Sequence, residues 1–310
     1  MTISPRYRIV LFASSCASLP LIEQLHQLEM LVGVVVSNRE DGDAQQLLAT
    51  LSEANIQTLA YVQGSNPTVA KSIQSWQANI GLIFSFPHRL PPSIIALFSG
   101  ALFNVHASLL PDYRGSAPLF WQLKNQQTNS GISIIKVEEK LDEGPIVWQQ
   151  PLVITPLDTL NSLTSRVMSI VPSVVVSFLQ QLANGAIDAR LQLGRGCHAH
   201  RPQAEDVQVN WATMSSAQIC ALARACNPTY GGALLCFNGV TVGLYQATEI
   251  ALPTFGVNAG TVVYVGEPHG LVIATFDGAI RLDVMNLKEG VFSGLNFAEH
   301  FCFDAGMSFD

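Results

Sequence analysis

The pattern of apolar and polar residues in the first half of the chain alternates between two periodicities. Leu19, Ile22, Leu25 and Leu28 recur at the spacing of one helix face. Between such stretches lie short runs rich in Val, Ile and Phe, which are typical of buried strands. These runs predict strands at 8–14, 31–37, 57–62, 79–86, 101–106, 131–137 and 145–154. Because strands alternate with helices, we expect a mostly parallel α/β sheet, in which ligands bind beyond the carboxyl ends of the strands.

The second half of the chain shows a different pattern. A long helical stretch at 155–185 ends on Asn184-Gly185, a pair typical of a helix C-terminus. One helix at about 213–226 then precedes several β-type runs, which turn signals such as Asn238-Gly239 separate. We therefore expect a second domain that is mainly β and forms a small barrel. The predicted boundaries are 1–190 for the α/β domain, 191–205 for a linker and 206–310 for the β domain.

Length and composition agree with a folded, two-domain protein. The chain has 310 residues, which favours two domains over one. Hydrophobic residues make up 48% and charged residues 13%, a balance that excludes intrinsic disorder. No uninterrupted apolar run reaches the roughly 18 residues of a membrane span. The six cysteines are too few and too irregularly spaced for a disulfide framework, so we expect a reduced, cytoplasmic protein without a membrane partner.

The charge balance argues against a nucleic-acid partner. The net charge is −7, and residues 191–310 carry only five basic residues against ten acidic ones. A protein that grips a phosphate backbone needs clustered Lys and Arg side chains. Nucleic acid is therefore a disfavoured partner, and a small-molecule substrate is favoured.

Two motifs that often bind cofactors are missing or incomplete. The turn after the first predicted strand, FASSCASLP, contains no glycine, so a dinucleotide-binding loop is not expected. Cys197, His198 and His200 are potential metal ligands, but their spacing is too tight for a structural zinc site. We expect them to lie in a solvated linker, and we expect no metal.

A third constellation has the residue types of a catalytic site. Asn104 and His106 lie two residues apart at the end of a predicted strand, so both side chains point to one face. A His at this position is suited to act as a general base, and an Asn amide can stabilise a developing oxyanion. Asp142, in a polar LDEG loop, is a candidate to orient the His.

Three segments around these residues carry a resemblance to a known family. They are FSFPHRLP at 84–91, FNVHASLLPDYRG at 103–115 and LDEGPIV at 141–147. They resemble the 10-formyltetrahydrofolate-dependent formyltransferases, which include methionyl-tRNA formyltransferase, sugar-nucleotide N-formyltransferases and glycinamide ribonucleotide transformylase. The resemblance covers residues 7–185 clearly and 201–290 more weakly. It implies a Rossmann-like formyltransferase sheet followed by an OB-like domain.

The resemblance also implies roles for the three candidate residues. An amine attacks the formyl carbon of 10-formyltetrahydrofolate, and His106 takes up the amine proton. Asn104 and the protonated His106 stabilise the oxyanion, while Asp142 supports His106. The products are an N-formyl compound and tetrahydrofolate. The folate pocket would be formed by Phe86, His88, Arg89, Leu90, Ser108, Leu109, Leu110, Pro111, Glu138, Glu139, Lys140 and Leu141.

The acceptor amine is less determined. The segment 37–43 is short and acidic where the tRNA enzymes carry a basic loop, and this favours a small amine such as an amino sugar nucleotide or an amino acid derivative. Tyr113 and Arg114, expected to be exposed in a turn, are the candidate acceptor contacts. Methionyl-tRNA is the alternative acceptor. A formyltetrahydrofolate hydrolase and a non-catalytic folate-binding module are further alternatives, and the oligomeric state is open.

Overall fold

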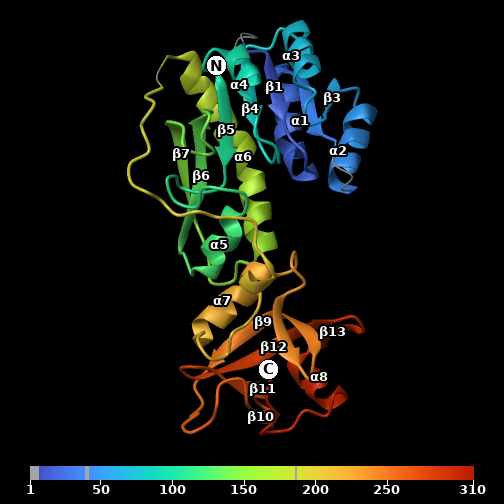
Figure 1. Ribbon diagram of the computed structural model, residues 1–310, viewed down its shortest axis with the longest axis vertical. Coiled ribbons are helices and arrows are strands. Elements are labelled where there is room, and N and C mark those ends of the chain that lie inside the picture. Colours follow the sequence, from blue (N-terminus) through green and yellow to red (C-terminus); the bar gives the residue numbers. More distant parts are fainter. Residues whose placement is uncertain (1–6, 39–41, 186) are drawn as a thin grey trace. The chain divides into compact units, whose positions relative to one another are not determined.

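Seven strands form one sheet in the order β3-β2-β1-β4-β5-β6-β7 (Figure 1). The computed structural model describes residues 7–38, 42–185 and 187–310. Strands β1 to β5 pair in parallel, whereas β6 runs antiparallel to β5. The strands are β1 (Ile9–Phe12), β2 (Leu31–Ser37), β3 (Thr58–Tyr61), β4 (Ile80–Ile83), β5 (Leu102–His106), β6 (Asn129–Lys136) and β7 (Ile146–Val153). They overlap all seven predicted strands, and the mostly parallel α/β fold is confirmed.

The order of the strands reverses between β1 and β4. In open α/β sheets such a switch point opens a crevice beyond the carboxyl ends of the two strands. The helices of this part of the chain are α1 (Leu19–Gln27), α2 (Gly42–Glu53), α3 (Asn66–Ser75), α4 (Pro92–Ile95) and α6 (Leu160–Ala183), with 3₁₀ turns at Cys16–Ser18 and Ala96–Phe98. A ligand-binding site is therefore expected near the segments that follow β1 and β4.

Helix α6 lies along one face of the sheet (Figure 1). Among the described residues it is the one helix long and apolar enough to cross a membrane by length and composition. Its apolar stripe is buried, however, with Val167, Val171 and Val175 at 0% exposure. Phe178 of the same stripe packs edge-on against Phe103 of β5, with ring centroids 4.8 Å apart. We conclude that α6 is a core helix of this sheet.

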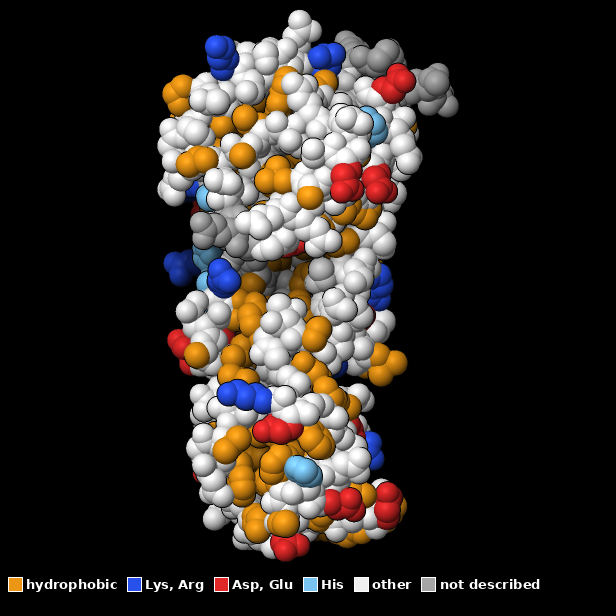
Figure 2. Space-filling model, turned by 90° about the vertical axis from the view of Figure 1, so that its right-hand side faces the viewer, with side chains coloured by type: hydrophobic (Ala, Val, Ile, Leu, Met, Phe, Trp, Pro, Cys, Tyr) orange, Lys and Arg blue, Asp and Glu red, His pale blue; other side chains and the backbone are white. Residues whose placement is uncertain are grey.

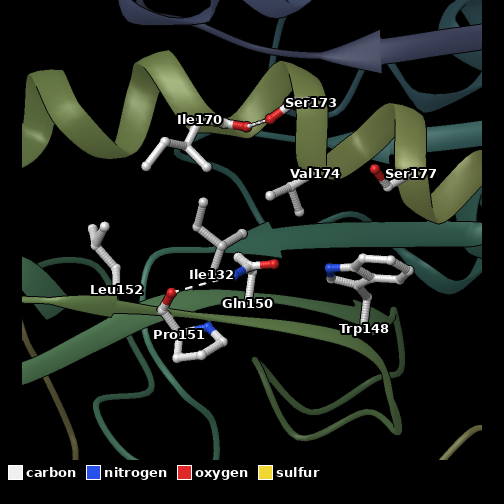
Figure 3. A pocket seen from close by; sticks show the side chains of 9 residues that line it. All are labelled: Ile132, Trp148, Gln150, Pro151, Leu152, Ile170, Ser173, Val174 and Ser177. Carbon is white, nitrogen blue, oxygen red and sulfur yellow. Dashed lines mark hydrogen bonds between the residues drawn. The ribbon is translucent and has the colours of Figure 1, made fainter.

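A cavity of about 200 Å³ lies between α6 and the sheet near β6 and β7 (Figure 3). Its walls are Ile132, Trp148, Gln150, Pro151, Leu152, Ile170, Ser173, Val174 and Ser177. None of these is a predicted site residue. The cavity lies on the face of the sheet that α6 covers, so it is distinct from the strand-end crevice.

A second sheet is antiparallel and pairs in the order β10-β11-β12-β9-β8, with β13 on β12. Its elements are α7 (Ser216–Cys226), β8 (Ala233–Phe237), β9 (Val240–Ile250), β10 (Val262–Gly266), β11 (Gly270–Ala274), β12 (Ala279–Leu287), β13 (Gly290–Ser293) and α8 (Gly294–His300), after a 3₁₀ turn at Ala204–Asp206. Helix α5 (Pro118–Lys124) clusters with this sheet rather than with the first.

The C-terminal residues complete this second sheet. The Val262 amide donates to the Met307 carbonyl and the Phe309 amide to the Gly260 carbonyl, which attaches the tail to the β10 side. The Asp310 amide donates to the Cys236 carbonyl of β8. Because the tail bonds to both edges, it joins β10 to β8 and closes the predicted small barrel.

The contact pattern divides the chain into two compact units that are each described by themselves. One contains the first sheet and comprises Met1–Ser116, Ser130–Leu152 and Ser165–Ala199. The other contains the second sheet and comprises Ala117–Asn129, Val153–Thr164 and His200–Asp310. Residues 191–199 of the predicted linker therefore belong to the first unit.

Candidate active site

Strand β5 ends on the two residues expected to carry the chemistry. Asn104 is half-buried, and His106 is 6% exposed. The antiparallel register places them opposite Ile135 and Ser133 of β6. Both side chains lie at the carboxyl end of the parallel part of the sheet, where α/β proteins bind ligands.

The loop between β6 and β7 brings Asp142 to this strand end. The Asp142 side chain is buried, and its Oδ1 accepts a hydrogen bond of 2.9 Å from Asn104 Nδ2. Its Oδ2 accepts a bond of 3.0 Å from the Gly115 amide and lies 3.7 Å from His106 Nδ1. The structure thus brings Asn104, His106 and Asp142 together around one carboxylate.

The second nitrogen of the imidazole is bound to the backbone. His106 Nε2 lies 2.8 Å from the Tyr113 carbonyl oxygen. A carbonyl oxygen only accepts hydrogen bonds, so Nε2 carries the hydrogen. In the neutral ring Nδ1 then has the free lone pair, on the side of Asp142. Of the two ring nitrogens, Nδ1 is therefore the one with a lone pair that can accept a proton.

The turn after β5 is fastened to the sheet by Ser133. The Ser133 hydroxyl donates to the Ser108 carbonyl at 2.6 Å and accepts from the Leu110 amide at 3.0 Å. The side-chain amide of Gln149 donates both to this hydroxyl and to the Leu110 carbonyl. The Ser108 carbonyl and both backbone groups of Leu110 are therefore occupied within the protein.

We expect Ser133→Ala to lower the free energy of unfolding by about 1–3 kcal/mol, because it leaves buried groups of the turn unpaired. Urea denaturation followed by circular dichroism measures this change. Ser169→Ala is the matched control, since Ser169 is exposed on α6 and bonds only within its own helix turn. An equal, small effect for both variants would contradict the role of Ser133.

The predicted folate residues lie on three segments, and two of these, 86–90 and 138–141, are linked by a shared hydrophobic cluster. Leu90 is buried in this cluster, and Phe86 and Val137 pack against it. Val137 immediately precedes the exposed residues Glu138, Glu139, Lys140 and Leu141. The segment after β4 and the loop that leads to Asp142 are thus neighbours. Arg89 is exposed, and Leu109 and Pro111 are half-buried on the turn.

His88 lies in an aromatic group at the switch point of the sheet. Its Nε2 lies 2.6 Å from the Ser37 hydroxyl at the end of β2. Its ring centroid is 5.1 Å from that of Tyr61 and 5.4 Å from that of Phe86. Burial raises the pKa of Tyr61 above its usual value, so its hydroxyl stays protonated at neutral pH.

The turn after β1 is tied to the start of α2. The Asp43 carboxylate accepts a hydrogen bond of 3.0 Å from the Cys16 amide. Burial and the Asp43 carboxylate raise the pKa of the Cys16 thiol to about 11, which keeps it protonated at neutral pH. The acidic residues Glu40 and Asp41 of the predicted short loop, with Arg39, lie outside the described residues.

The expectation that the turn exposes Arg114 is wrong. Arg114 is 9% exposed, and its Nε and Nη2 donate to Gln192 Oε1 at 2.9 and 2.7 Å. Its Nη1 donates to the Arg195 carbonyl at 3.3 Å. The guanidinium thus donates its hydrogen bonds to Gln192 and Arg195 of the same chain, which argues against the predicted contact with an acceptor phosphate. Tyr113, the other predicted acceptor contact, is half-buried and supplies its carbonyl to His106.

Gln192 is the site residue that sequence reasoning missed. Its side-chain Nε2 donates to the Asp142 carbonyl at 2.7 Å and to the Gly144 carbonyl at 2.8 Å. The residue stands in a segment without periodicity, which was predicted to be a linker. Only its partners, 50 and 78 positions away, reveal that it belongs to the site.

The Cys197, His198 and His200 group does not form a metal cluster. Cys197 Sγ accepts a hydrogen bond from the Tyr113 amide, while His200 Nε2 lies 3.0 Å from Asp206 Oδ2. Across residues 7–38, 42–185 and 187–310, no three His, Cys, Asp or Glu side chains are grouped to hold a metal ion.

Comparison with known proteins places this site in a family. The formyl transferase family model matches residues 8–179, and that of the formyl transferase C-terminal domain matches residues 202–298. The chain belongs to the formyl transferase family. It is a formyltransferase, and the family's formyl donor is formyltetrahydrofolate.

Proteins similar to this chain include two methionyl-tRNA formyltransferases and one N-formyltransferase of known structure. A methionyl-tRNA formyltransferase from Synechococcus elongatus is 26% identical over 97% of this chain and 99% of its own, and one from Fusobacterium nucleatum is 30% identical over 69% and 68%. An N-formyltransferase from Helicobacter canadensis, solved with folinic acid and dTDP-3-aminofucose, shares the fold with a TM-score of 0.68. It is 15% identical and covers 92% of this chain and 100% of its own.

Proposed function

We propose that this protein transfers the formyl group of 10-formyltetrahydrofolate to a small primary amine, and that Asn104, His106 and Asp142 carry the reaction. The observation that supports this assignment is the shared carboxylate. Asp142 binds Asn104 through one oxygen and faces His106 with the other. In this proposal His106 is the proton acceptor, Asn104 is the amide donor and Asp142 is the orienting carboxylate. The three side chains lie within a few ångströms of one another at the end of β5.

The proposed steps follow from the hydrogen bonds. The Tyr113 carbonyl occupies His106 Nε2, so Nδ1 is the ring nitrogen that can take up a proton. As the amine nitrogen bonds to the formyl carbon, the amine loses a proton to Nδ1. The Asn104 amide has two hydrogens, and one is donated to Asp142. The second is available to the formyl oxygen as negative charge develops on it. The bond from the formyl carbon to the folate nitrogen then breaks, and His106 returns the proton to that nitrogen.

The folate would lie between the two chain segments that share a hydrophobic cluster. Phe86 and Leu90 would offer apolar walls, with His88 and Arg89 beside them, and the loop at Glu138, Glu139, Lys140 and Leu141 would lie opposite. On the turn, Leu109 and Pro111 are half-buried and would act as a wall, whereas Ser108 and Leu110 are buried. The Ser108 carbonyl and both backbone groups of Leu110 are already bonded within the protein. A flat ring with several polar edge atoms suits a slot with apolar walls and an exposed loop on one side.

Charge supports a small amine as the acceptor. Residues 191–310 contain five basic and ten acidic residues, and in Figure 2 the Lys and Arg side chains over the C-terminal unit are sparse. A tRNA acceptor would need clustered cations there. The Helicobacter canadensis structure with a dTDP-amino sugar gives a precedent for such an acceptor within the fold. We place the reaction in the cytoplasm.

Methionyl-tRNA is the second candidate acceptor. It is favoured by a relative of that name that aligns over 97% of this chain, including the C-terminal unit. A formyltetrahydrofolate hydrolase would differ from both candidates, since it would release formate with no acceptor present.

Salt dependence separates the two acceptors. We expect transfer to a dTDP-amino sugar to change less than about threefold between ~50 and ~200 mM salt, whereas a tRNA acceptor held by several phosphate contacts would lose far more. Tetrahydrofolate release is measured with each acceptor and with none. Efficient transfer to methionyl-tRNA, with a steep loss in salt, would overturn the small-amine assignment. Release without any acceptor would indicate the hydrolase.

A further inference from the structure

The segment after α6 is an extended strap, residues 190–199, that lies against the candidate active site. Figure 1 shows it as the yellow segment that passes the β6–β7 side of the sheet. Arg190 exchanges two backbone hydrogen bonds with Ile146 at the start of β7. At its other end, Ala199 donates to the Arg114 carbonyl and Cys197 accepts from the Arg114 amide. The strap is thus attached both beyond the Asp142 loop and at the turn after β5 that contains Arg114, which we call the catalytic turn.

Gln192 is the one strap side chain that bonds to both of these segments. Its Nε2 donates both hydrogens, to the carbonyls of Asp142 and Gly144, at 2.7 and 2.8 Å. Its Oε1 accepts two hydrogens from the Arg114 guanidinium. Every polar atom of the side-chain amide is used, so the amide has one orientation that satisfies all its partners.

The two residues that Gln192 and the strap hold have unusual backbone conformations. Asp142 has a φ of 55° and Tyr113 a φ of 60°, in the left-handed region that non-glycine residues rarely adopt. Such conformations persist only where the surroundings hold them. Gln192 binds the carbonyl of Asp142, and Cys197 Sγ accepts the amide hydrogen of Tyr113.

Both strained residues contact His106. The Asp142 carboxylate faces Nδ1, and the Tyr113 carbonyl accepts from Nε2. The peptide plane that Gln192 holds begins at the Asp142 carbonyl carbon, which is bonded to Cα, and Cα carries the Cβ to which the carboxylate is attached. Its orientation sets the direction of the Cα–Cβ bond, and the carboxylate at the end of this side chain is then held by Asn104 and the Gly115 amide.

We propose that Gln192 is a positioning residue for formyl transfer, which sets the Asp142 carboxylate between Asn104 and His106 and links it to Arg114 of the catalytic turn. This proposal rests on the proposed function of the triad. Gln192 acts through Asp142 and has no role in binding either substrate. Its effect therefore falls on kcat and leaves the KM for the formyl donor unchanged.

The test is Gln192→Glu, which keeps the size of the side chain and the oxygen that accepts both Arg114 hydrogens. It removes the two donated hydrogens and places a carboxylate oxygen against the carbonyls of Asp142 and Gly144. We expect kcat to fall on the order of tenfold, with the KM for 10-formyltetrahydrofolate within about twofold, because the catalytic geometry is disturbed and not the binding walls. Gln181→Glu, the same charge change at an exposed position of α6, is the matched control and leaves both parameters unchanged.

A double variant distinguishes positioning from a general structural role. If Gln192 acts through Asp142, then Gln192→Glu costs little when Asp142→Asn is already present, so the two losses are not additive. Additive losses, a changed KM with an unchanged kcat, or an unchanged kcat would each overturn the proposal. The melting temperature of each variant shows whether it is folded.

Hydrogen exchange of the Gly115 amide tests the same idea without any turnover. This amide donates to Asp142 Oδ2, so displacement of the carboxylate exposes it. We expect exchange on the order of tenfold faster in Gln192→Glu, with the Val105 amide of β5 unchanged. Unchanged exchange at Gly115 would overturn the role of Gln192. If the wild-type protein transferred no formyl group, the proposed function would fail, and this exchange measurement would still decide the role of Gln192.

Discussion

Replacing His106 with alanine lowers kcat for formyl transfer by about 10²- to 10⁴-fold, the range for loss of a general base. The substitution removes Nδ1, the one ring nitrogen that is free to accept the amine proton. It also leaves the Asp142 carboxylate without the cation that it would stabilise. Because the imidazole does not form a wall of the proposed folate slot, binding of tetrahydrofolate stays within a few-fold of the wild-type value.

The measurement is the initial rate of tetrahydrofolate formation at saturating donor and acceptor. His26→Ala, at an exposed position of α1, is the control and retains the full rate. A loss of less than a few-fold in His106→Ala would remove the mechanism proposed for this site. A large loss together with loss of folate binding would instead assign His106 to the pocket.

Replacing Asn104 with leucine lowers kcat by about 10²- to 10³-fold, as expected when a donor to a developing oxyanion is removed. Leucine has nearly the same shape but no hydrogen to donate. The change also leaves Asp142 Oδ1 without its partner at 2.9 Å, so part of the loss reflects a carboxylate that is less well held.

The same rate assay measures this loss, and Asn161→Leu at an exposed position of α6 is the control. The KM for the amine separates the two contributions. A purely catalytic donor lowers kcat alone, whereas an Asn that binds the acceptor raises KM and leaves kcat intact. The second pattern would contradict the role that we assign to Asn104.

Much of the first sheet follows from local pattern. All seven predicted strands are present. A buried strand is marked by a short run of Val, Ile and Phe residues, and such a run can be recognised within a few neighbouring positions of the sequence. The pairing of Asn104 and His106 on one side of β5 follows in the same way from the period of a strand. The hypothesis that they carry the chemistry could therefore be made from residue type and spacing.

The sequence by itself determined which elements form and which residue types stand at the end of β5. Only the tertiary structure decided that the Arg114 guanidinium is buried against Gln192, that the strap lies on the site, and that the tail closes the barrel. Each of these depends on partners far apart in the chain, such as Arg114 and Gln192 at a separation of 78 positions. A hydrogen bond of that kind forms only after the sheet has brought its partners together. The pattern of apolar and polar residues near either partner therefore does not predict it.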